Sequence, residues 1–225
     1  MMRTVTDLIR PDTIASTLAV LLPGAYGIPE DFQREGFISA LRERDLPVDV
    51  VLADMNLECI TDGSALALLR NTIIRPARDA GYRTIWLIGI SIGGFMAMAY
   101  VDRHPGEIDG ICLIAPYPGN RMITNEISAS GGILGWSPSL IPEEDHERRV
   151  WHWLKNHAAC PTTVHIGYGE NDRFAAAHSA MSAALPPERV HALPGDHDWP
   201  TWRDIWIRFL DTGVIAQPDE REHPR

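Results

Sequence analysis

Short apolar runs alternate with amphipathic stretches along most of the chain. Six of the runs are rich in Val, Ile and Leu and lack a strict alternation of apolar and polar residues. This pattern is typical of strands that are covered on both faces in a parallel sheet. The predicted strands are residues 18–22, 48–52, 84–90, 110–115, 162–166 and 189–193.

The stretches between these runs predict helices. In residues 30–44, for example, Phe37, Ile38 and Leu41 fall on one stripe, as expected of a helix with one buried face. The predicted helices are residues 30–44, 62–80, 92–103, 142–157, 174–185 and 199–210. Strands that alternate with helices through short connections indicate an α/β fold, with one mostly parallel sheet and helices on both of its faces.

The segment between the fourth and fifth predicted strands, residues 117–160, interrupts this alternation. It begins irregularly and continues as a predicted helix, on which Glu144–Arg148 and Asp145–Arg149 have the spacing of favourable i,i+4 ion pairs. An insertion of this length at one sheet edge is usually a lid or a binding loop. The alternative is a helix that only covers the sheet.

One motif with chemical meaning follows the third predicted strand. Gly89-Ile90-Ser91-Ile92-Gly93 fits the pattern G-x-S-x-G, with an apolar strand before it and a helix of small residues after it. A strand-to-helix turn this sharp strains the serine, and the glycines leave room for neighbouring backbone. The hydroxyl then lies at a helix N-terminus, whose partial positive charge favours a developing oxyanion. The alternative is a glycine-rich turn without a catalytic role.

A serine nucleophile needs a base, and the base needs an orienting acid. Among the nine histidines, His197 differs because it lies in the loop after the last predicted strand, at the same sheet edge as Ser91. The loop after the fifth strand ends at the same edge and contains Asp172, which we favour as the acid, and Glu170, which is its rival.

The order Ser91, Asp172, His197 and the loops around these residues resemble the α/β-hydrolase superfamily, from about Leu18 to Leu210. The resemblance implies an α/β-hydrolase fold of about six main parallel strands, in the order 2-1-3-4-5-6, with a lid-like insertion before the acid strand. The few residues before Leu18 leave room for a degenerate N-terminal strand at most. We expect one domain over residues 1–216, followed by a polar tail over residues 217–225.

The exit of the first predicted strand resembles the oxyanion loop of this superfamily, although Pro23 stands where the family usually has His. The donors of an oxyanion hole are backbone N–H groups, so this departure leaves the hole possible. By this resemblance, the amides of Ala25 and Ile92 are the expected donors. Tyr26 is an expected substrate contact beside them.

The resemblance implies a serine hydrolase that cleaves small-molecule carboxylic esters through an acyl-enzyme intermediate. A thioesterase or a C–C bond hydrolase would use the same three residues, and a non-catalytic ligand-binding protein on this scaffold is a third alternative. Trp136 and Trp151 in the insertion are expected to line the acyl pocket. No cofactor is required, and no metal is expected, because adjacent residues such as Asp196, His197 and Asp198 rarely converge on one ion.

The charge and the hydropathy argue against nucleic acid and membranes as the main partners. The formal net charge is −10, whereas nucleic acids and anionic membrane surfaces are bound by basic faces. No apolar stretch approaches the length of a membrane span and no secretory signal is visible, so a cytoplasmic location is expected. Basic residues in the insertion leave a coenzyme A thioester open; they are Arg121, Arg148, Arg149 and Lys155.

Overall fold

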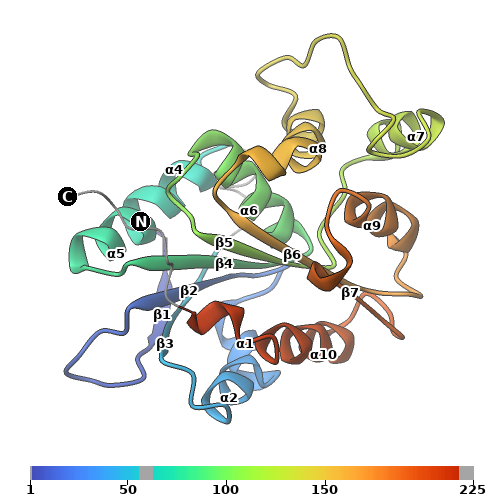
Figure 1. Cartoon of the computed structure of the whole chain (residues 1–225). Helices are drawn as coiled ribbons and strands as arrows, with labels where there is room; N and C mark the ends of the chain where they lie inside the picture. The colour runs from blue at the N-terminus through green and yellow to red at the C-terminus, as the bar shows by residue number, and fades with distance from the viewer. Residues whose placement is uncertain (1, 56–62, 218–225) are drawn as a thin grey trace.

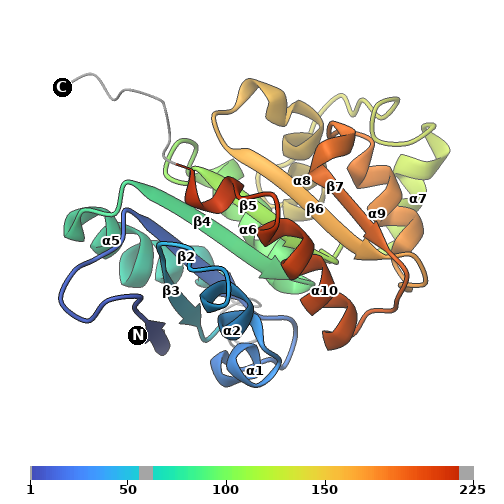
Figure 2. The ribbon, with the colours of Figure 1, turned by 60° about the horizontal axis from the view of Figure 1, so that its bottom comes forward.

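A central sheet with helices on both faces organises the computed structural model, which describes residues 2–55 and 63–217 (Figure 1, Figure 2). The strands are β1 (Thr4–Asp7), β2 (Thr17–Leu22), β3 (Val48–Ala53), β4 (Thr84–Ile90), β5 (Gly110–Ile114), β6 (Thr163–Gly169) and β7 (Val190–Leu193). The helices are α1 (Pro29–Arg34), α2 (Phe37–Arg42), α4 (Ala65–Leu69), α5 (Arg75–Ala80), α6 (Ile92–Arg103), α7 (Arg121–Ala129), α8 (His146–Asn156), α9 (Ala175–Ser182) and α10 (Trp199–Leu210). Of the predicted tail, all but Gln217 lies outside the described residues.

The strands of the sheet lie in the order β1-β3-β2-β4-β5-β6-β7 in the described part of the chain. β2 to β7 are parallel and have the predicted order, so the fold prediction is confirmed. β1 is the degenerate N-terminal strand and pairs antiparallel with β3 at the edge. Parallel pairing brings the carboxyl ends of β4, β6 and β7, and the loops that follow them, to one edge of the sheet.

Two apolar layers cover the sheet. On one face α1, α2 and α10 pack against the strands, with Phe37 stacked on Trp206 at 5.9 Å between ring centroids (Figure 2). On the other face α4 to α6, α8 and α9 form the second layer. The central strands β2, β4 and β5 are buried over their whole length, which explains their continuous apolar sequences.

A buried carboxylate fastens the N-terminal segment to the sheet. Asp49 in β3 is fully buried, and its oxygens accept hydrogen bonds from the N–H groups of Ile9 (2.9 Å) and Ala15 (2.8 Å) and from the Tyr82 hydroxyl (2.9 Å). Buried charges are tolerated when they are hydrogen-bonded in this way. This explains how a polar residue can stand within an apolar strand.

Two predicted helices are interrupted, each at an identifiable residue. The helix predicted over residues 30–44 is divided into α1 and α2 at Gly36, whose φ of 84° ends the first helix. The helix predicted over residues 62–80 begins outside the described residues and contains a π-helical turn, Arg70–Ile74, between α4 and α5. Pro76 lacks the N–H that would bond one turn back, and the wider turn absorbs this loss.

The insertion contains a helix that the sequence analysis did not predict. Asn120 caps α7, because its side-chain oxygen accepts from the N–H of Met122 (2.7 Å) and of Ile123 (3.3 Å). The helix predicted over residues 142–157 begins four residues later than expected, as α8, where Asp145 accepts from the Arg148 N–H. α8 packs against α6, whereas α7 lies farther out, beyond the sheet (Figure 1).

The predicted i,i+4 ion pairs on α8 are wrong. Arg148 pairs instead with Asp145 and with Glu126 of α7, and Arg149 pairs with Asp102 of α6. Long side chains on a short helix reach acids on neighbouring helices as easily as acids on their own helix, and tertiary packing decides between them.

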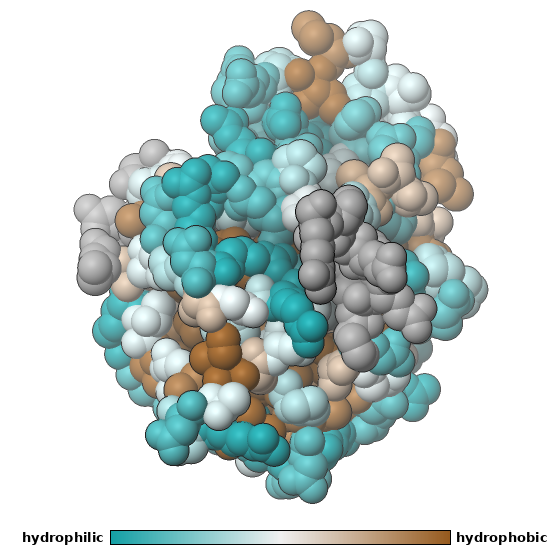
Figure 3. Space-filling model, turned by 60° about the vertical axis from the view of Figure 1, so that its left-hand side comes forward, coloured by the Kyte–Doolittle hydropathy of each residue, from teal (hydrophilic) through white to brown (hydrophobic). Residues whose placement is uncertain are grey.

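The face of the molecule on the α5 side mixes hydrophilic and hydrophobic residues (Figure 3). Hydrophobic residues also gather at the top of that view, over the outer part of the insertion. Leu134 and Leu140 of the insertion are exposed by 64% and 79%. No helix among the described residues is long and apolar enough to cross a membrane.

Two stacked histidines between β6 and β7 make stability depend on pH. His165 Nδ1 lies 3.2 Å from His191 Nε2, and both side chains are buried. Burial, together with His191 and Arg189, lowers the pKa of His165 to about 4. The unfolded chain binds this proton near pH 6.5, so the contribution to stability is full above that pH and is lost as the pH falls toward 4.

We therefore expect the free energy of unfolding to fall by about 2 kcal/mol on this account between pH 7 and pH 5. Urea unfolding at both pH values measures it. The variant His165→Phe should lose less stability over this interval, whereas the exposed His152→Phe should behave like the wild type. An equal loss in His165→Phe and in the wild type would contradict the assignment.

Candidate active site

Ser91 occupies a strained turn between β4 and α6. Its backbone has φ 51° and ψ −113°, outside the regions that serine prefers. The turn is held by backbone hydrogen bonds: the Ser91 N–H donates to Ile114 O (2.9 Å), and the Ser91 carbonyl accepts from Gly94, Phe95 and Tyr117. Strain of this kind persists where the surroundings over-determine the conformation, and such positions cluster at functional sites.

The two glycines of the motif are required by close backbone contacts. A Cβ on Gly89 would lie 2.4 Å from the carbonyl oxygen of Gly93, and a Cβ on Gly93 would lie 2.3 Å from that of Leu22. Both distances are far below van der Waals contact. The absence of side chains at these positions lets the first turn of α6 approach the ends of β4 and β2.

Ser91, His197 and Asp172 form one chain of hydrogen bonds. His197 Nε2 lies 3.0 Å from Ser91 Oγ, and His197 Nδ1 lies 2.6 Å from Asp172 Oδ2. The other oxygen of Asp172 accepts from the Phe174 N–H at 2.8 Å. The three side chains come from the loops after β4, β6 and β7, and Glu170, the rival acid, is exposed instead.

The environment of Asp172 keeps it ionised. Its side chain is fully buried, and burial raises the pKa of the carboxyl. The hydrogen bonds from His197 and from the Phe174 N–H outweigh burial, so the pKa of Asp172 lies below its ordinary value. An ionised carboxylate at Nδ1 fixes the imidazole tautomer whose Nε2 can accept the serine proton.

His178 is a residue of this site that the sequence analysis missed. It is fully buried on α9, its Nε2–H donates to Pro116 O at 2.8 Å, and its Nδ1 lies 4.0 Å from Asp172 Oδ2. Within the described residues Nδ1 has no hydrogen-bond partner. Burial lowers the pKa of His178 to about 4 despite the nearby carboxylate, so the ring is neutral. The hydrogen bond from His197 is therefore the interaction of Asp172 with an imidazole that can carry a charge.

The one available signal for His178 was its place on the helix that follows the acid loop, six residues after Asp172. A residue at that position in the helix can face back toward the loop that contains Asp172. A histidine within a helix is, however, more often part of the core. No pattern in the sequence favours the first interpretation over the second.

The loop after β2 carries one of the two expected oxyanion donors, Ala25, and the first residue of α6, Ile92, is the other. The N–H groups of Ala25 and Ile92 donate none of the hydrogen bonds found among the described residues. A Cβ on Gly24 would lie 3.6 Å from Ser91 Cβ, so this loop lies against the serine. Tyr26 has a φ of 63° and is 88% exposed, and the turn closes with a bond from Gly27 N to Gly24 O (3.0 Å).

A cavity of about 660 Å³ lies between the insertion and α9. Trp151 and Phe174 are among its lining residues, and the Phe174 ring also packs against His197 at 5.5 Å between centroids. Trp136 is not among the lining residues, and its Nε1–H donates to Glu126 (2.8 Å). Of the two tryptophans expected at the acyl pocket, the structure brings Trp151 to the cavity.

The acids beside His197 in the sequence have local structural contacts. Asp198 caps α10 by accepting from Thr201 N (3.1 Å), and the N–H of Asp196 donates to Thr201 Oγ1 (3.0 Å). Within residues 2–55 and 63–217, no three His, Cys, Asp or Glu side chains are grouped so that they could hold a metal ion.

Comparison by sequence yields neither a matching family model nor a matching curated protein. Comparison of structures is informative. Est1E from Butyrivibrio proteoclasticus is 19% identical, with a TM-score of 0.66 over 96% of this chain and 95% of that chain. FphF, a fluorophosphonate-binding serine hydrolase from Staphylococcus aureus, is 13% identical, with a TM-score of 0.68 over 95% and 92%.

The chain has the α/β-hydrolase fold. A monoacylglycerol lipase from Paleococcus ferrophilus has it as well, at 13% identity and a TM-score of 0.61, covering 96% of this chain and 99% of that chain. These alignments cover nearly the whole length of the chains on both sides. At these identities the likeness concerns the fold, and the chemistry depends on the residues of the site.

The glycine contacts of the α/β-hydrolase elbow lead to a stability prediction. Gly93 lies in a helix, where alanine is normally more stable by up to about 1 kcal/mol. The contact with the Leu22 carbonyl reverses this sign, so Gly93→Ala should lower the free energy of unfolding by about 3 kcal/mol or more.

Chemical denaturation of Gly93→Ala and of the wild type measures the effect, and Gly24→Ala is the matched control. A Cβ on Gly24 meets ordinary contacts at 3.6 Å, so this variant should remain within about 1 kcal/mol of the wild type. A Gly93→Ala protein as stable as the wild type would show that the close approach is not needed.

Proposed function

We propose that the chain is a serine hydrolase that cleaves carboxylic esters through an acyl-enzyme intermediate. The observation that carries the proposal is the hydrogen bond between Ser91 Oγ and His197 Nε2, with Asp172 on the other ring nitrogen. Two proteins with the same fold have names that point in the same direction: a fluorophosphonate-binding serine hydrolase and a monoacylglycerol lipase.

In the proposed first half-reaction, Ser91 Oγ attacks the ester carbonyl while His197 Nε2 takes the hydroxyl proton. Asp172 holds the imidazole in place and stabilises its positive form. The carbonyl oxygen becomes an oxyanion, which the N–H groups of Ala25 and Ile92 bind. The tetrahedral intermediate collapses, the alcohol leaves with the proton from His197, and the acyl group stays on Ser91.

In the second half-reaction, a water molecule gives a proton to His197 and attacks the acyl-enzyme. The same two amides bind the second oxyanion, Ser91 regains its proton, and the carboxylic acid is released. These steps require no cofactor. We propose Tyr26 and Trp151 as substrate contacts, whereas Trp136, which is not among the residues that line the cavity, has a packing role. A cytoplasmic location remains a prediction.

A thioesterase or a C–C bond hydrolase would use the same residues, and a non-catalytic binding protein would not turn over. Arg148, Arg149 and Lys155, which left a coenzyme A thioester open, are engaged within the protein: the arginines pair with acids, and Lys155 donates to Trp136 O (2.5 Å). The engagement of three of the four basic residues, all but Arg121, favours simple esters over coenzyme A thioesters.

The nucleophile is tested by Ser91→Ala. Loss of the attacking oxygen should lower kcat for a short-chain ester by at least about 10³-fold and abolish labelling by a fluorophosphonate probe. The fold should persist, because the turn is held by backbone hydrogen bonds. Circular dichroism checks folding. A wild-type protein that is neither labelled nor active on a panel of esters and thioesters would favour the non-catalytic alternative.

The acid is tested by comparing Asp172→Asn with Glu170→Gln. Asparagine can present an N–H toward His197 Nδ1 and so favour the wrong tautomer, and kcat should fall by about 10³–10⁴-fold. Glu170 is exposed, so Glu170→Gln should cost less than about tenfold. Steady-state rates at one pH decide, and the opposite ranking of the two variants would assign the acid to Glu170.

A further inference from the structure

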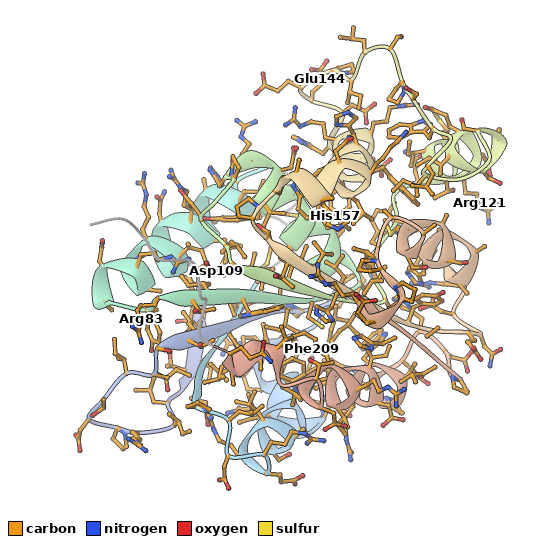
Figure 4. All side chains as sticks on the ribbon, viewed as in Figure 1. Arg83, Asp109, Arg121, Glu144, His157 and Phe209 are labelled. Atoms are coloured by element: carbon orange, nitrogen blue, oxygen red, sulfur yellow. The ribbon has the colours of Figure 1, made fainter. Side chains whose placement is uncertain are left out.

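Two arginines face the cavity beside the triad, and the residues that line it include no carboxylate. Arg121, at the first position of α7, and Arg173, directly after Asp172, are both lining residues. Arg121 lies on α7 at the side toward α9 (Figure 4). Both residues are exposed, and they bring one positive charge from the insertion and one from the acid loop to the lining of the cavity.

These two guanidinium groups lack the partners that other arginines of the insertion have. Arg148 and Arg149 pair with acids, whereas within the described part of the chain neither Arg121 nor Arg173 forms an ion pair. In a chain with a formal charge of −10, acids are plentiful, so two unpaired cations that share one cavity form a distinctive feature.

Nearby acids are engaged elsewhere. Glu126 on α7 binds Arg148 and the Trp136 indole, and Glu147 on α8 accepts from the N–H (3.1 Å) and the side-chain amide (2.5 Å) of Asn120. The positive charge of the cavity is therefore left for a ligand. An arginine favours carboxylate and phosphate oxygens, which its N–H groups can bind in pairs.

Arg173 contacts an aromatic ring that also packs against His197. Its guanidinium lies 4.8 Å from the centroid of the Phe174 ring, and the same ring packs against His197. One aromatic side chain thus separates the cationic part of the cavity from the catalytic base. A cavity of about 660 Å³ has the size of a ligand pocket.

We infer that this cavity binds an anionic group of the substrate, so that the enzyme prefers esters whose acyl chain ends in a carboxylate or a phosphate-like group. The inference rests on the proposed function for the reaction itself. Arg121 and Arg173 are the residues that determine this specificity. The apolar wall that includes Trp151 and Phe174 contacts the acyl chain of the substrate, between its ester carbonyl and its anionic end.

The experiment compares three methyl esters with the same spacing. They are methyl hexanoate, monomethyl adipate, which ends in a carboxylate, and methyl 5-phosphonopentanoate, which ends in a phosphonate. Wild-type kcat/KM, measured by proton release, should be at least tenfold higher for an anionic ester than for methyl hexanoate. The ranking of the two anionic esters shows whether the site takes a carboxylate or a phosphate-like group.

Arg121→Gln and Arg173→Gln should each reduce the ratio of anionic to neutral kcat/KM by at least fivefold. The ratio is used because Arg173 is the neighbour of Asp172, and its replacement can lower the activity on every ester. Such a general loss affects both rate constants equally and leaves their ratio unchanged. Arg83→Gln is the matched control, since Arg83 is exposed at the start of β4, far from Arg121 (Figure 4). Its ratio should equal that of the wild type.

The inference and the proposed function fail in different ways. If the wild type hydrolyses neutral and anionic esters equally well and Ser91→Ala hydrolyses neither, the esterase proposal stands and the anionic site is refuted. If no ester is hydrolysed, calorimetric titration of the wild type with monomethyl adipate and the phosphonate ester decides. Binding that is lost in Arg121→Gln and Arg173→Gln supports the anionic site, and the absence of binding refutes it.

Discussion

The contact between the first turn of α6 and the end of β2 governs the geometry of the whole site. Gly93 lies so close to the Leu22 carbonyl that no side chain fits between them. This approach sets the helix N-terminus beside the loop of Ala25 and bends the chain at Ser91 into a positive φ. The proposed nucleophile and the proposed oxyanion donors are therefore positioned by one backbone contact. Any larger residue at Gly93 would force these two groups apart.

Strand β5, which lies between the strands that precede Ser91 and Asp172, supports the site without adding a side chain to the triad. β5 lies between β4 and β6, and the loop after it supplies no member of the hydrogen-bonded chain. It binds each neighbour instead: Ile114 O accepts from Ser91 N, Tyr117 N donates to Ser91 O, and Pro116 O accepts from His178. Ala115 in this connection has a φ of 45°, so the strain of the elbow continues into the adjacent loop.

Those features that depend on local pattern or on strand ends were predictable from the sequence. Continuous apolar runs indicated the parallel strands, and the glycine spacing around Ser91 indicated the elbow. Features set by tertiary contacts could not be predicted from the sequence. Examples are the ion pair of Arg149 with Asp102 and the approach of His178 to Asp172, because no periodicity in the sequence relates these residues. The division at Gly36 and the unpredicted α7 were recognisable from a glycine and an asparagine cap, but apolar periodicity alone did not reveal them.

The buried carboxylate of Asp49 has a practical consequence for handling the protein. Two of its three hydrogen bonds come from the backbone of residues 9 and 15, ahead of the first parallel strand. A shortened chain that began at β2 would leave a charge in the sheet interior with the Tyr82 hydroxyl alone, and an uncompensated buried charge costs about 3–5 kcal/mol. The connection between β1 and β2 is thus part of the folding unit, and fusion partners are better joined ahead of it than in place of it.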